Sequence, residues 1–324
     1  MICPGCNTNS PKPHGKFGRA QIQRFRCRSC GRTFSERSYK LLRDFNVPDE
    51  KVVQILSGLL EGLSVRSVER LTGVHRDTII RIMLDAGNRC QDLLDAQIRN
   101  IPVSQVQVDE LWGYCFKKEK HKTREEFYKP EIGDAYTYLG LESRTKLILC
   151  FVLGKRNFRS ALRLVEALKR ATSGVFQLTT DGYKAYRDCV HLVFGDSIHF
   201  AQLVKLYSSD ESTHERYSPG KVVEAIPMRV TGEPCPENIS TSHVERLNLT
   251  MRMQMRRLTR LTSGFSKKWE NLEAALALMV AHYNFCRVHL SLKTTPAVKA
   301  NLTDHVWTIQ ELLSVNSQGN KAVA

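Results

Sequence analysis

Apolar residues recur at helical intervals from Pro48 onward. They predict a first helix that ends at Gly62, a short helix from Ser64 to Leu71, and a further helix that begins at Arg76. The turn between the last two, Thr72-Gly73-Val74-His75, is short and contains a glycine, which is typical of a helix-turn-helix. Any tight helical hairpin has the same spacing, so DNA recognition and plain helix packing both remain open.

In the DNA-binding interpretation, the second helix of this pair presents its outer face to the nucleic acid. Arg76, Thr78 and Arg81 lie on that face, together with Asp77. Such positions meet base edges or phosphates when a recognition helix enters the major groove. We therefore take Arg76, Thr78 and Arg81 as candidate DNA-binding residues.

Near residue 100 the pattern changes from helical to strand-like, with Asn100-Ile101-Pro102 as the boundary. Three neighbouring strands, then a helix, then a fourth strand are predicted, in the order Val103 to Tyr114, Asp134 to Glu142, Thr145 to Leu153, Asn157 to Thr172 and Val175 to Thr180. This order predicts a mixed sheet flanked by helices, as in an RNase H-like fold.

Two later segments complete the pattern. Ser266 to His289 predicts one long amphipathic helix packed on the sheet. The stretch from Tyr207 to Ile239, with strand-like Lys221 to Val230, has no place in a minimal RNase H-like domain. We leave that stretch unassigned.

Composition narrows the class of partner. The 324 residues correspond to about two domains, and a formal net charge of +15 favours a polyanion, with nucleic acid ahead of an acidic membrane surface. No apolar stretch is long enough to span a bilayer, and the N-terminus has no basic-then-apolar signal. We expect a cytoplasmic protein without a membrane partner.

Four cysteines near the N-terminus have the spacing of a metal site. Cys3-x2-Cys6 and Cys27-x2-Cys30 are separated by twenty residues, which matches a structural zinc site with four thiolates. Disulfides or free thiols are the alternative. Lys and Arg are dense between and after these cysteines, so the sequence predicts a zinc ribbon that contacts phosphate. The other six cysteines are scattered, as expected of reduced thiols.

Two aspartates occupy informative places on the predicted strands. Asp109 lies in the first strand, and Asp181 lies at the exit of the fourth, before Gly182. Ligands gather at the carboxyl ends of strands in open α/β sheets, and charges there are costly unless paired or bound to metal. The alternatives are a surface residue for Asp109 and an Asp-Gly turn for Asp181. Asp109 and Glu110 project to opposite faces, and alternation does not settle which face holds a site.

A third carboxylate, Glu245, is the only acid between Glu237 and Glu270. Two interpretations of Glu245 are open. It is either a functional carboxylate held close to phosphate or part of a capping box at a helix start, because Ser242 precedes it by three residues. The arginines that follow are equally ambiguous, since charged runs are usually solvated helix faces. Residues at positions 245, 248, 252 and 256 share one face of a helix.

Three segments resemble the acidic blocks of DDE transposases, in particular the class that mobilises the bacterial insertion sequence one. They are Gln107-Val108-Asp109-Glu110-Leu111-Trp112, Thr179-Thr180-Asp181-Gly182-Tyr183-Lys184-Ala185-Tyr186, and Ser242-His243-Val244-Glu245-Arg246-Leu247-Asn248 continuing to Arg252. The cysteine pairs and helix-turn-helix ahead of them, and segments Phe265-Ser266-Lys267-Lys268 and His282 to His289 after them, also resemble that family.

The resemblance implies an RNase H-like catalytic domain whose metal-binding acids are Asp109, Asp181 and Glu245. It further implies two Mg²⁺ ions, with Mn²⁺ as a substitute, that clamp the attacking and leaving oxygens at phosphorus. Beside the metals, four residues would hold the DNA backbone: Arg246, Asn248, Arg252 and Arg256. His243 is either a helper near the scissile phosphate or a surface or capping histidine.

The expected organisation is a zinc ribbon at 1–45, a helix-turn-helix domain at 46–99, a DDE catalytic domain at 100–300 and a C-terminal tail at 301–324. The expected function is a transposase of the bacterial nucleoid that binds element ends and target DNA as a homo-oligomer, with metal-dependent strand cleavage and transfer. The alternatives are a catalytically silent DNA-binding protein derived from a transposase, and an RNase H-type nuclease.

Overall fold

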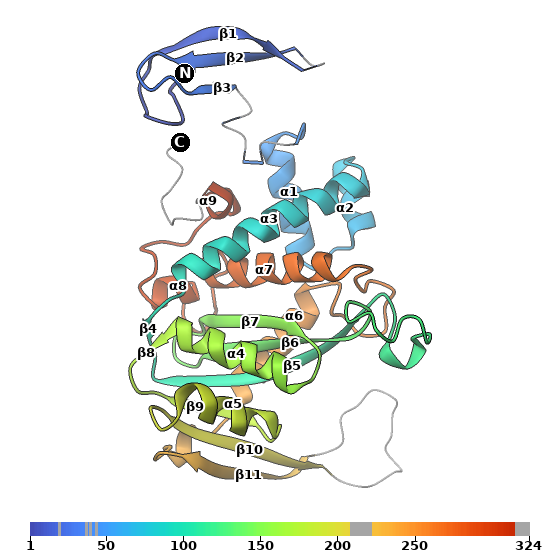
Figure 1. Ribbon diagram of the computed structural model, residues 1–324, viewed down its shortest axis with the longest axis vertical. Coiled ribbons are helices and arrows are strands. Elements are labelled where there is room, and N and C mark those ends of the chain that lie inside the picture. The colour runs from blue at the N-terminus through green and yellow to red at the C-terminus, as the bar shows by residue number, and fades with distance from the viewer. Residues whose placement is uncertain (19–20, 36–37, 39–40, 43–44, 208–221, 315–324) are drawn as a thin grey trace.

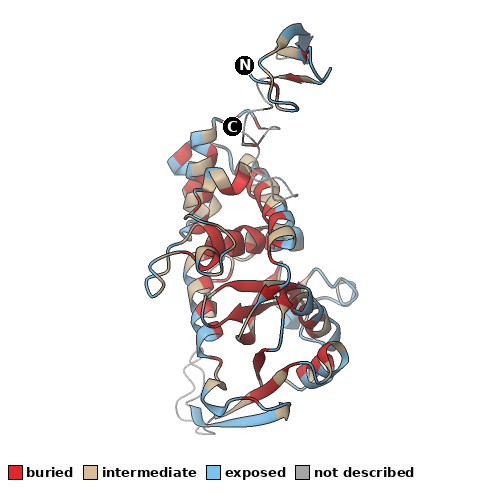
Figure 2. Ribbon diagram, turned by 90° about the vertical axis from the view of Figure 1, so that its left-hand side faces the viewer, coloured by how far each residue is buried: buried red, intermediate tan, exposed pale blue. Residues whose placement is uncertain are grey.

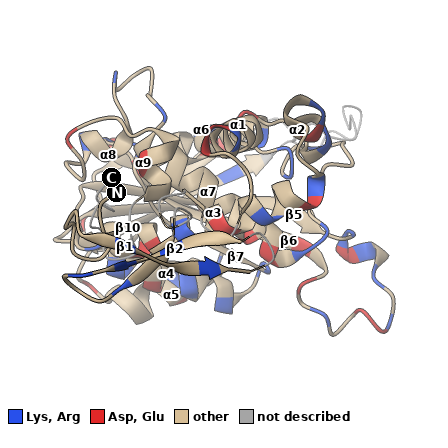
Figure 3. Ribbon diagram, turned by 90° about the horizontal axis from the view of Figure 1, so that it is seen from above, with Lys and Arg blue, Asp and Glu red and all other residues tan. Residues whose placement is uncertain are grey.

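The computed structural model describes residues 1–324 except 19–20, 36–37, 39–40, 43–44, 208–221 and 315–324. An antiparallel sheet of β1 (Pro11–Phe17), β2 (Ile22–Cys27) and β3 (Thr33–Ser35) lies at one end of the long axis, apart from the rest (Figure 1). Its small core holds Cys3, Cys27 and Phe34, packed against Phe25. Lys and Arg recur along its strands (Figure 3). Such a small core needs a further staple to be stable.

Three helices follow: α1 (Asp49–Leu60), α2 (Val65–Thr72) and α3 (Arg76–Gln97). The Ser64 hydroxyl accepts from the Ser67 amide and caps α2, and Gly73 ends it in the left-handed region at φ 70°. The helix-turn-helix geometry predicted from the sequence is therefore present, with α3 longer than its apolar period suggested.

The long helix α3 packs along α7 (Trp269–Phe285). Gly87 makes this close crossing feasible, because a Cβ there would lie 2.2 Å from the carbonyl oxygen of Ala274. A single hydrophobic core consequently runs from the N-terminal helices into the sheet layer, as the continuous buried band in Figure 2 shows.

The main sheet has the order β11-β10-β9-β5-β6-β7. Its strands are β5 (Gln105–Cys115), β6 (Gly133–Glu142), β7 (Ile148–Gly154), β9 (Gln177–Asp181), β10 (His199–Tyr207) and β11 (Val222–Thr231). Strands β5, β6 and β7 pair antiparallel, whereas β9 is parallel to β5 and β10 is parallel to β9. This is the RNase H-like order that the sequence predicts.

The edge strand β11 accounts for part of the unassigned stretch. It pairs antiparallel with β10 and is mostly exposed (Figure 2). A separate two-stranded ladder joins β4 (Ile101–Pro102) to β8 (Thr172–Ser173). The strand β11 thus extends the parallel side of the sheet beyond the minimal domain.

Helices cover the sheet on both faces. They are α4 (Phe158–Ala171), α5 (Ala185–Phe194) and α6 (Ser242–Gln254), with short α8 (Pro296–Lys299) and α9 (Ile309–Ser314), and 3₁₀ turns at Glu119–His121 and Pro236–Asn238. The predicted helix 266–289 is shorter, since α7 begins at Trp269 and ends at Phe285. On α7, the Asn284 amide bonds both backbone groups of Ile148 and so protects the β7 edge. None of the described helices is long and apolar enough to cross a membrane.

Candidate active site

Two aspartates meet where parallel strands separate. Strands β5 and β9 pair in register up to Val108 opposite Thr180, and Asp109 and Asp181 are the next residues on each strand. The carboxyl end of a parallel pair is the usual ligand position in such sheets. Both candidate acids therefore lie at one point, as their positions on predicted strands suggested.

Glu110 joins them. One carboxylate oxygen from each of Asp109, Glu110 and Asp181 lies within 4.8 Å of the others. The two side chains on β5 nevertheless belong to opposite faces: Asn248 Nδ2 of α6 donates to Asp109 Oδ2 at 2.8 Å, whereas Glu110 faces Tyr186 of α5. The site is thus built at the divergence of the strands, where both faces are reachable.

The electrostatics of this group favour a bound cation. Burial, together with the charges of Asp181 and Glu245, raises the pKa of Asp109 to about 6. Burial and the charge of Asp181 raise the pKa of Glu110 to about 7, and burial raises the pKa of Asp181. Like charges held together in a poorly solvated place disfavour ionisation. A hard cation with oxygen ligands would offset that cost.

Arg156 partly compensates two of these acids. Its Nη2 lies 3.6 Å from Glu110 Oε2 and 3.8 Å from Asp181 Oδ2, and its guanidinium carbon is 4.6 Å from the centroid of the Tyr183 ring. Both distances exceed a good charged hydrogen bond. The sequence did not predict a role for Arg156, because this residue follows a predicted strand and belongs to no recognisable motif.

Glu245 lies in the first turn of α6 and is exposed. Its charge contributes to the raised pKa of both aspartates, but its carboxylate lies outside the 4.8 Å group. Its Oε1 accepts from the Thr241 hydroxyl and pairs with Lys205 Nζ of β10. The charge of Lys205 acts on both aspartates as well, in the direction that lowers the pKa of each.

The capping box considered for Ser242 does not form. Thr241 is the N-cap residue, and the Ser242 hydroxyl accepts from the hydroxyl of Ser240. Glu245 binds the Thr241 hydroxyl instead of the backbone amide of Ser242. The sequence pattern was misleading because another residue supplies the cap.

That residue is Gln107 of β5. Its side-chain oxygen accepts from the amides of His243 and Val244 at 2.9 and 3.1 Å. It is buried and lies two residues before Asp109, on the same face of the strand. Gln107 therefore ties the start of α6 to the strand that carries Asp109, a contact across more than a hundred residues that no local pattern reveals.

The predicted DNA-binding residues around α6 have different surroundings. The side-chain amide of Asn248 donates its hydrogen bond to Asp109. Arg252 donates to the backbone oxygens of Leu258 and Trp112, both at 3.0 Å, and burial lowers its pKa to about 10. Arg246 is exposed on the helix. The predicted helical face does not reach position 256, because α6 ends at Gln254; Arg256 is exposed in the following turn.

On α3, Arg76 and Arg81 are exposed and Thr78 is half-buried. The Arg81 guanidinium lies 5.3 Å from the centroid of the Phe45 ring, and the His75 ring caps the helix by accepting from the Asp77 amide. All three predicted residues are thus at the start of this helix with at least part of each side chain accessible.

The four cysteines converge. Sulfur atoms of Cys3, Cys6, Cys27 and Cys30 lie within 4.8 Å of one another, with 3.6 Å between Cys3 and Cys30 and 3.5 Å between Cys6 and Cys27. A tetrahedral Zn–S distance of about 2.3 Å requires sulfurs about 3.8 Å apart, so the arrangement fits the ion. The Gly5 amide also points to Cys3 Sγ, at 3.4 Å.

No protein-family model matches this sequence, and no curated protein matches it. Several solved structures are similar, among them the following two. A piggyBac transposase synaptic complex with hairpin DNA is 10% identical with a TM-score of 0.41, over 84% of this chain and 72% of that one. A simian T-cell lymphotropic virus intasome in complex with PP2A regulatory subunit B56 gamma is 11% identical with a TM-score of 0.34, over 76% and 74%. The geometry of the site itself therefore carries the functional argument.

Proposed function

We propose that this protein is a DNA transposase that cleaves and transfers strands with divalent metal ions. The observation that carries the proposal is the meeting of Asp109 and Asp181 at the carboxyl end of paired parallel strands, with Glu245 on α6, the helix whose Asn248 donates a hydrogen bond to Asp109. A +15 chain that places its converging carboxylates there has a polyanion as its natural substrate. Phosphoryl transfer on DNA unites these two features.

Asp109, Asp181 and Glu245 are the proposed metal-holding residues, and Glu110 is close enough to assist. Bound Mg²⁺ or Mn²⁺ would activate the attacking oxygen and stabilise the leaving oxygen at phosphorus. The chain's own residues orient this group: Asn248 holds one oxygen of Asp109, and Gln107 fixes the start of α6. Lys205, which pairs with Glu245 in the DNA-free protein, would be available to a phosphate once Glu245 binds metal.

DNA binding is assigned to three regions. The basic sheet β1–β3, stapled by Zn²⁺ on the four cysteines, would contact phosphates. The start of α3, with Arg76, Thr78 and Arg81, would read the element end. Arg246 would hold the DNA backbone near the acids and Arg256 would hold it beyond the far end of α6, whereas the two carbonyl contacts of Arg252 support a structural role. Two copies would be needed to bring two DNA ends together.

The test uses purified protein, Mg²⁺ and DNA fragments that carry the terminal repeats flanking the reading frame. We expect cleavage and joining of these ends, and we expect Asp181→Asn to abolish both while end binding survives. Asp188→Asn, an exposed acid on α5, is the matched control and should retain activity. Equal joining by the Asp181 variant would refute the metal assignment, and binding without any Mg²⁺-dependent joining by the parent would favour the silent DNA-binding protein.

A further inference from the structure

A cavity of about 680 Å³ lies where the N-terminal helices meet the loop after α6. Its apolar lining includes Leu59, Leu63, Ile80, Met83, Phe265 and Met279. Five cations complete its lining: Arg66, Arg76, Arg256, Arg257 and Lys267. Among the residues that line it there is neither Asp nor Glu. We call it the basic cavity.

The five cations lack carboxylate partners in the described part of the chain. Arg257 is the clearest case. Its side chain is partly buried, which lowers its pKa, and its hydrogen bond among the described residues runs from Nη2 to Met83 Sδ at 3.0 Å. A partly buried charge whose hydrogen-bond partner is a thioether sulfur is poorly compensated. An anion in the basic cavity would remove that cost.

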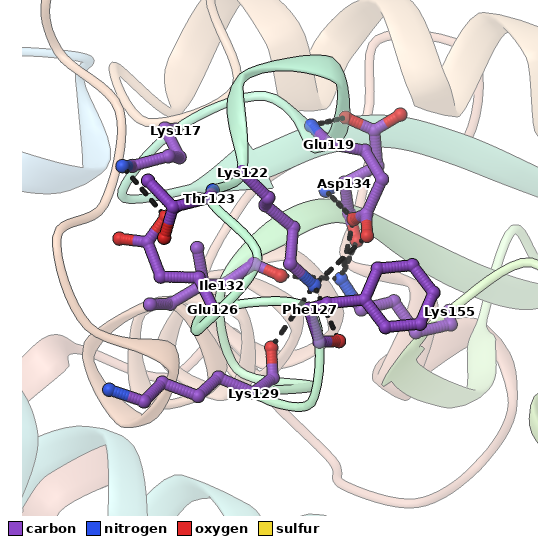
Figure 4. A network of polar contacts seen from close by, with 10 residues as sticks. All are labelled: Lys117, Glu119, Lys122, Thr123, Glu126, Phe127, Lys129, Ile132, Asp134 and Lys155. Atoms are coloured by element: carbon purple, nitrogen blue, oxygen red, sulfur yellow. Dashed lines mark hydrogen bonds and ion pairs between the residues drawn. The ribbon is translucent and has the colours of Figure 1, made fainter.

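Elsewhere the chain compensates such charges. In the loop between β5 and β6, Lys117 pairs with Glu126, and Glu119 pairs both with Lys122 of the same loop and with Lys155, which follows β7 (Figure 4). The Lys122 ammonium also donates to the backbone oxygens of Phe127 and Lys129. Against this background, cations around a cavity that have no carboxylate partner among the described residues indicate a ligand, although one of them, Lys267, also lies over the Phe265 ring at 3.6 Å.

The basic cavity joins two of the three regions assigned to DNA, the start of α3 and the segment after α6. Arg76, at the start of α3, is part of its lining, and Arg256 follows the end of α6. The opposite end of α6 carries Glu245, and its 13 residues span about 20 Å. A strand held at the acids would therefore reach the cavity within a few nucleotides along this helix.

We propose that the basic cavity binds an unpaired segment of a DNA strand, whose bases contact its apolar lining and whose phosphates contact its cations. A duplex keeps its bases stacked inside and offers mainly phosphates to such a site, whereas an unpaired strand offers both surfaces. The proposal rests on the proposed function only in taking DNA as the polyanion. It adds a place for strands that separate at a cleaved end.

The test is the affinity of fluorescein-labelled DNA in EDTA, measured by anisotropy, so that no cleavage occurs. Two probes share one arbitrary duplex sequence, and one carries a 3′ tail of about six unpaired nucleotides. We expect the tail to increase affinity about tenfold. That gain should disappear in two variants, the double variant Arg66→Gln with Arg256→Gln and the single variant Leu63→Gln. All three residues are exposed. Arg159→Gln with Arg170→Gln, two exposed arginines on α4, is the charge-matched control and should keep it.

Thermal melts of each variant show whether it is folded. A tail that adds nothing in the parent, or a gain that survives in the cavity variants, would overturn the proposal. The measurement is independent of chemistry: a failed tail effect with intact Mg²⁺-dependent joining leaves the transposase proposal standing. A clear tail effect without joining supports the basic cavity alone.

Discussion

At the residue scale, two of the three predicted acids, Asp109 and Asp181, meet in a group whose third member is Glu110, and Glu245 lies outside that group. The polar residues that orient this part of the site carry no signal in the sequence. Gln107 and Asn248 are ordinary polar residues whose roles depend on contacts between β5 and α6. The sequence drew attention to Asp109 and Asp181 because a charged side chain on a core strand is costly unless it is paired or bound to metal. No comparable signal distinguishes a side-chain amide such as that of Gln107 or Asn248, because an uncharged amide can form hydrogen bonds with many kinds of partner.

Asn248→Ala tests the orienting role. Without its amide, Asp109 Oδ2 loses a 2.8 Å hydrogen bond and the carboxylate is free to rotate. We expect the affinity for Mn²⁺ to fall about 10-fold to 100-fold, as is typical for residues that orient metal ligands. Isothermal titration of the DNA-free protein measures this. Thr250→Ala, on the same helix and away from Asp109, is the control; an unchanged affinity in Asn248→Ala would remove the role.

His282 predicts a pH dependence of stability. Burial, with the nearby charge of Arg287, lowers its pKa to about 4. The unfolded chain, with a pKa near 6.5, binds the proton first as pH falls, so stability is present above 6.5 and is lost toward pH 4. We expect a loss of about 2 kcal/mol between pH 7.5 and 5 that His282→Leu lacks. Urea unfolding at both pH values checks this; equal losses in parent and variant would contradict it.

At the element scale, strands and helices followed their periodicity closely. The predicted strands at 134–142 and 175–180 correspond to β6 and β9 with small shifts at their ends. Errors came where contacts between distant parts decide: α6 is capped by Gln107 rather than Ser242, and α3 extends along α7 beyond its predicted apolar face. Tertiary packing overrides local preference in both places.

The crossing of α3 and α7 depends on Gly87. A methyl group there would lie 2.2 Å from the oxygen of Ala274, so the two helices must separate. We expect Gly87→Ala to lower the free energy of unfolding by about 1–3 kcal/mol, despite the higher helix propensity of alanine. Asn88→Ala, the exposed neighbour, should be neutral or slightly stabilising. Urea unfolding compares them, and a stabilised Gly87 variant would show that the crossing is looser than described.

At the scale of the whole molecule, the helices that carry the helix-turn-helix share a core with the sheet, while β1–β3 has a core of its own. A sequence divided at residue 100 does not reveal this, because each half has enough apolar residues for a separate core. The charge of +15 was readable from composition, but its concentration around the basic cavity was not, since Arg66, Arg256 and Lys267 come from distant segments.

The most direct test of the central claim is anomalous diffraction from crystals of the protein soaked in Mn²⁺. The metal-dependent mechanism predicts manganese peaks in contact with Asp109 and Asp181, with Glu245 released from Lys205 and turned toward the metal. Asp181→Asn crystals under the same conditions should lose these peaks. Parent crystals without manganese at Asp109 and Asp181, at a concentration that supports strand cleavage in solution, would contradict the account.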